Sequence, residues 1–212
     1  MAESLFYVEH KPKENQEHAP LLVLLHGYGS HEQDLFSFAE ELPHQLRIIS
    51  VRAPQSMGFG AYCWYEINFD ANENKFSDIG QAKESLHKID GLIDDLQAKY
   101  HPKKTFLLGF SQGAILSYAY SFNYINKVNH VLALSGFLVD DLLPDHMSSG
   151  ITTDYYASHG SADQVIPVEW ARKCQPFLKS LGLDCDYSEY PVGHGVAPQN
   201  FYSFRDWMDK RL

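Results

Sequence analysis

The stretch Thr105-Phe-Leu-Leu-Gly-Phe-Ser-Gln-Gly-Ala114 contains the pattern that best predicts the fold of this chain. A short apolar run ends in Gly109-Phe110-Ser111-Gln112-Gly113, and apolar residues at helical spacing follow at once. G-x-S-x-G is the pattern of the nucleophile elbow, a sharp strand-to-helix turn that exposes a serine hydroxyl. Its glycines are needed because side chains there would collide with the adjacent strand and helix. The pattern alone has low specificity, but the buried strand before it and the helix after it supply the expected context.

Strands and helices alternate on both sides of this stretch, which predicts an α/β fold with a mostly parallel central sheet and helices on both faces. The predicted strands cover Leu5–Val8 (at the edge), Leu21–Leu25, Arg47–Val51, Phe106–Leu108, Val131–Leu134, Tyr155–Ala157 and Asp186–Tyr190, and the other predicted helices cover 78–99, 168–181 and 197–210. Residues 54–77 form a long aromatic excursion without a clear period, which is typical of a functional loop or of one with small elements of its own. No linker or repeat divides the chain, so we expect one domain over residues 1–212, with no separate cap domain.

Composition and charge exclude several classes of function. The chain has 212 residues, 44% of them hydrophobic and 21% charged, as is usual for a globular protein. Its net charge of -10 argues against nucleic acid as the main partner and against a basic patch that binds an anionic membrane. Three scattered cysteines are too few for a disulfide framework or a zinc site. We find no signal peptide, and the longest apolar run is far too short to span a bilayer, so we expect a cytoplasmic protein without stable membrane insertion.

A serine hydroxyl needs a general base to accept its proton and an acid to orient that base. In the predicted fold these groups follow in the chain order Ser, Asp or Glu, His, on loops at the C-terminal edge of the sheet. His194, between two glycines and after a predicted strand, is the candidate base, and Asp163 after the preceding strand is the candidate acid. Asp140 and Asp141 also follow a strand and remain alternatives for the acid. His159 comes before Asp163 in the chain, so with that acid it breaks the order.

The oxyanion of an acyl-transfer reaction needs two backbone N–H donors. One belongs to Gln112, the residue after the candidate nucleophile, and we assign the other to Tyr28 in the turn His26-Gly27-Tyr28-Gly29. Gly27 and Gly29 lack the third glycine of a dinucleotide-binding fingerprint. No P-loop lysine, H-E-x-x-H pair or Cys/His metal spacing occurs either. We therefore expect neither a metal nor an organic cofactor.

These motifs together resemble the phospholipase/carboxylesterase family of α/β-hydrolases, which includes the acyl-protein thioesterases. The resemblance covers roughly residues 20–210, in order. It is carried by Leu25-His26-Gly27-Tyr28-Gly29, Arg52-Ala53-Pro54, Trp64-Tyr65, Gly109-Phe110-Ser111-Gln112-Gly113, Leu134-Ser135-Gly136, His159-Gly160-Ser161-Ala162-Asp163 and Gly193-His194-Gly195. Gly29-Ser-His-Glu-Gln-Asp-Leu35 and Ala114 are closer to the bacterial carboxylesterase branch than to the eukaryotic thioesterases.

The resemblance implies a serine carboxylesterase that hydrolyses short- to medium-chain esters through an acyl-enzyme intermediate. An acyl-protein thioesterase or a lysophospholipase is the alternative. A non-catalytic binding module on the same scaffold has less support, because all three members of the candidate triad are present. Trp64, Phe137 and Leu138 lie in segments that should border the nucleophile, and we predict that they contact the acyl part of a small-molecule substrate. A homodimer would be in keeping with the family.

Overall fold

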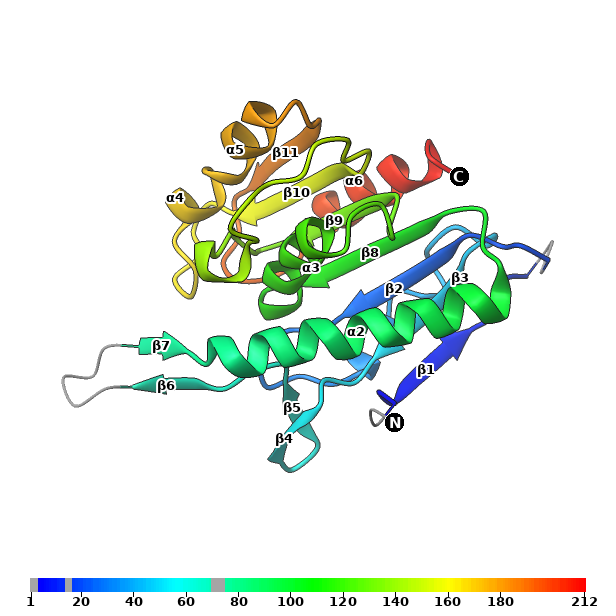
Figure 1. Ribbon diagram of the computed structural model, residues 1–212, viewed down its shortest axis with the longest axis horizontal. Helices are drawn as coiled ribbons and strands as arrows, with labels where there is room; N and C mark the ends of the chain where they lie inside the picture. Colours follow the sequence, from blue (N-terminus) through cyan, green and yellow to red (C-terminus); the bar gives the residue numbers. More distant parts are fainter. Residues whose placement is uncertain (1–3, 14–16, 70–74) are drawn as a thin grey trace.

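The computed structural model describes residues 4–13, 17–69 and 75–212, and a seven-stranded sheet forms the centre of the molecule (Figure 1). The strand order is β1-β3-β2-β8-β9-β10-β11, and every neighbouring pair is parallel except β1 with β3. The strands of this sheet are β1 (Tyr7–His10), β2 (Leu21–Leu25), β3 (Arg47–Val51), β8 (Thr105–Phe110), β9 (His130–Leu134), β10 (Asp154–Gly160) and β11 (Cys185–Tyr190).

Helices follow the strands of the sheet, and all but the C-terminal α6 connect one strand to the next. They are α1 (Gln33–Phe36), α2 (Ile79–Tyr100), α3 (Gln112–Asn123), the 3-10 turn η1 (Asp140–Leu142), α4 (Val168–Ala171), α5 (Cys174–Ser180) and α6 (Pro198–Asp209). Asp78 precedes α2, and its carboxylate accepts a hydrogen bond from the Gln81 amide at 2.9 Å, which caps the first turn. No helix in the described ranges combines the length and hydrophobicity that crossing a membrane requires.

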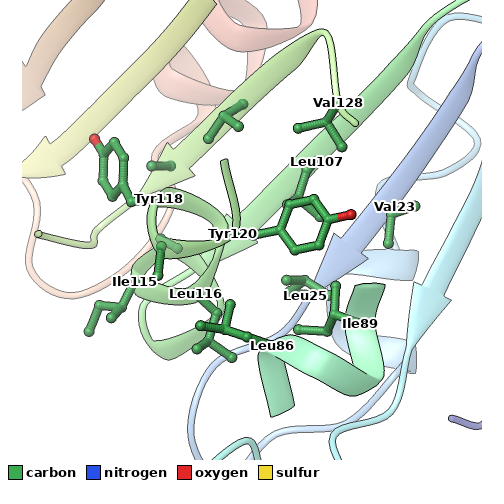
Figure 2. Close-up of a cluster of buried hydrophobic side chains, with 14 of the residues drawn as sticks. Val23, Leu25, Leu86, Ile89, Leu107, Ile115, Leu116, Tyr118, Tyr120 and Val128 are labelled. Carbon is green, nitrogen blue, oxygen red and sulfur yellow. The ribbon is translucent and has the colours of Figure 1, made fainter. Parts of the chain in front are cut away.

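Both faces of the sheet are buried. The central strands are continuous apolar runs, so they present apolar side chains to both faces. In β2, Val23 and Leu25 pack in the cluster that contains residues of α2 and α3, shown in Figure 2. Leu22 and Leu24 of the same strand pack on the other face with residues of α1 and α6. The predicted α/β fold with a mostly parallel sheet and helices on both faces is therefore confirmed.

One predicted helix is divided in two in the structure. The predicted helix over 168–181 is interrupted after Ala171, and α5 starts only at Cys174. Pro176 explains the break, because a proline inside a continuous helix has no N–H to donate and its ring clashes with the carbonyl four residues earlier. Restarting the helix at Cys174 puts Pro176 in a first turn, where it is tolerated.

The edge strand β1 covers Tyr7–His10 rather than Leu5–Val8, because pairing with β3 sets its limits and not apolarity alone. Glu9 lies opposite Ile49, and its carboxylate accepts a hydrogen bond from Arg47 on the same neighbouring strand.

The aromatic excursion between β3 and α2 forms two small hairpins that project from the body of the molecule (Figure 1). They consist of β4 (Gln55–Gly58) with β5 (Ala61–Cys63) and β6 (Ile67–Phe69) with β7 (Lys75–Ser77). Residues 70–74 of the excursion lie outside the described residues. The prediction that this long segment carries small elements of its own is confirmed for the part described.

Candidate active site

Ser111 occupies the tight turn between β8 and α3, with φ 53° and ψ −114°, a conformation that non-glycine residues rarely adopt. A Cβ atom on Gly109 would lie 2.2 Å from the carbonyl oxygen of Gly113. A Cβ atom on Gly113 would lie 2.0 Å from the carbonyl oxygen of Leu25. Only glycine fits at either position, so the two glycines allow strand, turn and helix to close around the serine.

The imidazole of His194 lies between Ser111 and Asp163. Its Nε2 is 2.9 Å from the Ser111 Oγ, and its Nδ1 is 2.6 Å from a carboxylate oxygen of Asp163. The three residues follow β8, β10 and β11, which are all parallel, so their loops meet at one edge of the sheet (Figure 1). Asp140 and Asp141, the alternatives for the acid, lie in η1 instead. The structure thus brings the three residues of the predicted triad within hydrogen-bond distance.

The carboxylate of Asp163 is fully buried yet amply hydrogen-bonded. Its Oδ1 accepts from the backbone amides of Val165 at 2.8 Å and Ile166 at 2.9 Å, which leaves Oδ2 for the imidazole. Burial raises the pKa of Asp163, but hydrogen bonds from Ile166 and His194 oppose burial, and the net effect lowers the pKa. Because an ionised carboxylate only accepts hydrogen bonds, the imidazole carries its proton on Nδ1, and Nε2 can accept the proton of the serine.

A second histidine, His159, lies against the same carboxylate. Its fully buried ring places Nε2 3.2 Å from Asp163 Oδ2 and 2.9 Å from the carbonyl oxygen of Ile166. A carbonyl only accepts, so Nε2 carries the proton of this ring and donates it toward both oxygens. His159 therefore contacts the acid and not the serine, which agrees with its place in the chain order.

The glycine-rich turn after β2 packs directly against the elbow. A Cβ atom on Gly27 would lie 3.4 Å from the Cβ of Ser111. Within the described ranges, the amide of Tyr28 donates to no protein acceptor. The amide of Gln112 is the first in α3, where N–H groups have no partner in the helix. Two backbone amides without a protein acceptor in the described ranges therefore belong to segments that adjoin Ser111: the Gln112 amide follows it in the chain, and the Tyr28 amide belongs to the turn packed against it.

The sequence comparisons show the family of the chain. Residues 9–212 match the protein family described as Phospholipase/Carboxylesterase. The chain belongs to this family. The acyl-protein thioesterase 1 of Yarrowia lipolytica is 26% identical over 211 residues, which cover 92% of this chain and 93% of that protein. The resemblance inferred from the motifs is confirmed, and family membership identifies the chain as a hydrolase related to carboxylesterases and acyl-protein thioesterases.

Solved structures show the same fold. The structure of esterase PE8 is 24% identical with a TM-score of 0.80 and covers 99% of both chains. The carboxylesterase of Bacillus cereus is 18% identical with a TM-score of 0.82, over 98% of this chain and 95% of that one. The likeness establishes the α/β-hydrolase fold for this phospholipase/carboxylesterase family member.

A cavity of about 400 Å³ lies between the loop after β9 and helices α4 and α5. It is lined by Phe137, Leu138, Asp140, Trp170, Lys173 and Phe177. The rings of Phe137 and Trp170 are 4.9 Å apart, and Trp170 is 46% exposed. Phe137 and Leu138, both predicted to contact an acyl chain, therefore line one cavity. In the part of the chain that the structure describes, no three His, Cys, Asp or Glu side chains are grouped to hold a metal ion.

Trp64 is placed differently from the prediction that it contacts the acyl chain. Its side chain is fully buried and does not line the cavity. The indole Nε1 donates to the carbonyl oxygen of His26 at 2.8 Å, and the backbone amide donates to the side chain of Gln112 at 2.8 Å. Burial of the indole N–H requires such an acceptor, and the acceptor lies in the glycine-rich turn after β2, not in the cavity.

Sequence reasoning missed three aromatic residues, one beside His194 and two in the lining of the cavity. The ring of Phe110 lies 5.1 Å from that of His194, and its position next to Ser111 in the elbow was the available signal. Trp170 and Phe177 lie on α4 and α5, and helical periodicity does not separate a cavity-lining aromatic residue from an ordinary core residue.

Proposed function

We propose that this protein is a serine carboxylesterase that hydrolyses short- to medium-chain esters through an acyl-enzyme intermediate. The observation that carries the proposal is the continuous hydrogen-bonded relay from Asp163 through His194 to Ser111, with distances of 2.6 and 2.9 Å. Such a relay is what a serine hydroxyl requires to act as a nucleophile at neutral pH.

In the proposed first step, the Oγ of Ser111 forms a bond to the acyl carbon as His194 Nε2 accepts the hydroxyl proton. The tetrahedral intermediate collapses, the bond to the leaving alkoxide breaks, and His194 returns the proton to that oxygen. Water then attacks the acyl-enzyme by the same route and releases the acid. Asp163 keeps the proton of the imidazole on Nδ1 and stabilises the imidazolium while it is charged.

The backbone amides of Tyr28 and Gln112 are the proposed donors to the oxyanion. Both amides lack a protein acceptor in the described ranges and belong to segments that adjoin Ser111, which supports this role, since donors that are already oriented stabilise the developing charge without reorganisation. The positive end of the α3 helix dipole favours a negative charge at the same place.

The cavity lined by Phe137, Leu138 and Trp170 is the proposed acyl site. Its volume of about 400 Å³ lies in the range typical of small-molecule sites, about 300–1,000 Å³. Its aromatic and aliphatic lining residues suit a hydrocarbon chain, with Asp140 and Lys173 as its polar lining, and its size favours short to medium chains.

Covalent labelling and turnover test the proposal together. A fluorophosphonate probe followed by peptide mapping should label Ser111, and Ser111→Ala should lower kcat for p-nitrophenyl butyrate by several orders of magnitude, on the order of 10⁴–10⁶. The Ser117→Ala variant is a matched control, because Ser117 is buried in α3 and bonded to the Gly113 carbonyl. Labelling at another residue, or turnover by Ser111→Ala equal to that of the control, would overturn the proposal.

A thioesterase activity of the same site is the second candidate, and the acyl-protein thioesterase relative favours it. The chemistry would be identical except that a thiolate leaves. Comparing kcat/KM for matched butyryl and octanoyl oxygen esters, thioesters and lysophospholipids would rank the substrate classes.

A further inference from the structure

The buried side chains of Gln112, Trp64 and His26 form a chain of contacts that links the two proposed oxyanion amides. We propose that these three are positioning residues, which fix the Tyr28 amide relative to the Gln112 amide. The inference rests on the proposed function, since it concerns how that oxyanion site is held. It also gives Trp64 a role other than contact with the acyl chain.

The chain begins at the side-chain amide of Gln112, which is 3% exposed. Its Oε1 accepts from the backbone amide of Trp64, and its Nε2 donates to the carbonyl oxygen of Tyr65, both at 2.8 Å. Both ends of the amide are thus bound to one dipeptide that lies more than forty residues earlier in the sequence. The first residue of α3 is tied to the segment between β5 and β6.

Trp64 connects Gln112 to the proposed oxyanion turn, His26-Gly27-Tyr28-Gly29. Its indole Nε1 donates to the carbonyl oxygen of His26 at 2.8 Å, and the indole packs against the imidazole of His26 with ring centroids 5.6 Å apart. The carbonyl oxygen of Trp64 in turn accepts from the Ser85 hydroxyl on α2. The indole is therefore fixed at the point where β2 enters the turn.

His26 completes the link through its ring. Nε2 accepts from the backbone amide of Ala53 at 3.1 Å, so Nδ1 carries the proton and donates to the carbonyl oxygen of Gly27 at 2.8 Å. That carbonyl belongs to the same planar peptide unit as the N–H of Tyr28. Holding the C=O on one side of a trans peptide fixes the direction in which its N–H points.

The three side chains are at most 3% exposed, so water cannot replace these bonds in a shielded interior. The consequence is specific to the transition state. A tilt of the Tyr28 peptide weakens a hydrogen bond that forms fully only when the oxyanion develops, and it leaves ground-state binding of the ester unchanged.

Trp64→Phe tests this role. It replaces the indole by a phenyl ring, which is still aromatic but has no N–H to donate to the His26 carbonyl oxygen. Losing an oxyanion donor outright costs about 10²–10³-fold in kcat, so misalignment of one donor should cost about 10- to 30-fold. We expect kcat for p-nitrophenyl butyrate to fall by that factor, with KM within about twofold of wild type. Affinity for butylboronic acid, which forms a tetrahedral adduct, should fall by the same factor as kcat.

Trp207→Phe is the matched control. Trp207 is also a buried tryptophan, and its Nε1 donates to Asp186 at 2.6 Å, but it lies on α6 against His130 at the opposite end of the sheet. This variant also loses an indole N–H hydrogen bond, and its kcat and boronate affinity should equal those of wild type. If Trp64→Phe folds poorly, β-(3-benzothienyl)alanine at position 64 removes the donor and keeps the bicyclic shape.

A kcat for the position-64 variants within twofold of the Trp207→Phe control would overturn the inference. A changed KM and chain-length preference at constant kcat would also overturn it, since that result would place Trp64 in the acyl site. Ser111→Ala distinguishes failure of the proposed function from failure of the positioning role. If it retains turnover, the proposed function fails. If it is inactive while the position-64 variants are unaffected, only the positioning role fails.

Discussion

Gly160→Ala tests most directly how closely the loops of the site pack together. Gly160 is the last residue of β10, and a Cβ atom there would lie 2.1 Å from the carbonyl oxygen of Gly193 and 2.5 Å from that of Val192. Both obstacles are backbone atoms, so no side-chain rotation relieves the contact. The loop from β11 to α6 must move, and His194 is the next residue along it.

The size of the displacement follows from the distances. Restoring even the 3.0 Å separation that real Cβ atoms hardly ever go below requires the Gly193 carbonyl to move by about 1 Å. The neighbouring imidazole makes its bond to Ser111 at 2.9 Å, so a shift of this size breaks or misaligns it. A misplacement of about 1 Å costs about 10²-fold in rate, and overpacking of this kind costs about 1–3 kcal/mol in the free energy of unfolding.

The assay is p-nitrophenyl butyrate turnover combined with urea unfolding followed by circular dichroism. Gly91→Ala is the control, because Gly91 lies exposed on α2 with no atom within 4 Å of its added Cβ. That variant should keep the wild-type kcat and gain up to about 1 kcal/mol in the free energy of unfolding. A Gly160→Ala protein with wild-type stability and a kcat within threefold of the control would refute the reasoning.

Three other variants probe the acid, the cavity and the glycine-rich turn after β2. Asp163→Asn should lower kcat about 10⁴-fold in steady-state ester hydrolysis, because an amide in place of the carboxylate favours the wrong imidazole tautomer; a loss below 100-fold would argue against Asp163 as the acid. Trp170→Ala should reduce kcat/KM for octanoyl esters about tenfold more than for acetyl esters, since losing contact with about two methylenes at about 0.8 kcal/mol each corresponds to about tenfold; a uniform loss would contradict the acyl site. Burial lowers the pKa of His26 below its ordinary value of 6.5 despite the opposing hydrogen bond to Gly27, so the unfolded state binds the extra proton and stability falls as the pH drops below 6.5. In urea titrations between pH 6.5 and 5, His26→Gln should flatten this slope by up to about 1.4 kcal/mol per pH unit, and equal slopes would exclude a neutral buried His26.

Local patterns were sufficient to predict much of the fold and the composition of the site. Apolar runs and helical periodicity predicted the parallel sheet with helices on both faces, because a strand that is buried on both faces is apolar at consecutive positions. The glycines around Ser111 predicted the elbow for a steric reason that involves only its immediate neighbours. Chain order then selected Asp163 and His194, which the structure brings together with the serine; their catalytic roles stay proposals.

Tertiary structure alone decided which long-range partners the buried polar groups have. The place of Trp64 in a long aromatic segment predicted a pocket residue, but its indole N–H donates a hydrogen bond to the His26 carbonyl oxygen in the turn after β2. His159 looked unsuitable as a base, and the structure places it against the carboxylate of Asp163. A buried hydrogen-bond donor requires an acceptor. The sequence identifies the donor, but which acceptor lies next to it depends on how segments far apart in the chain pack together.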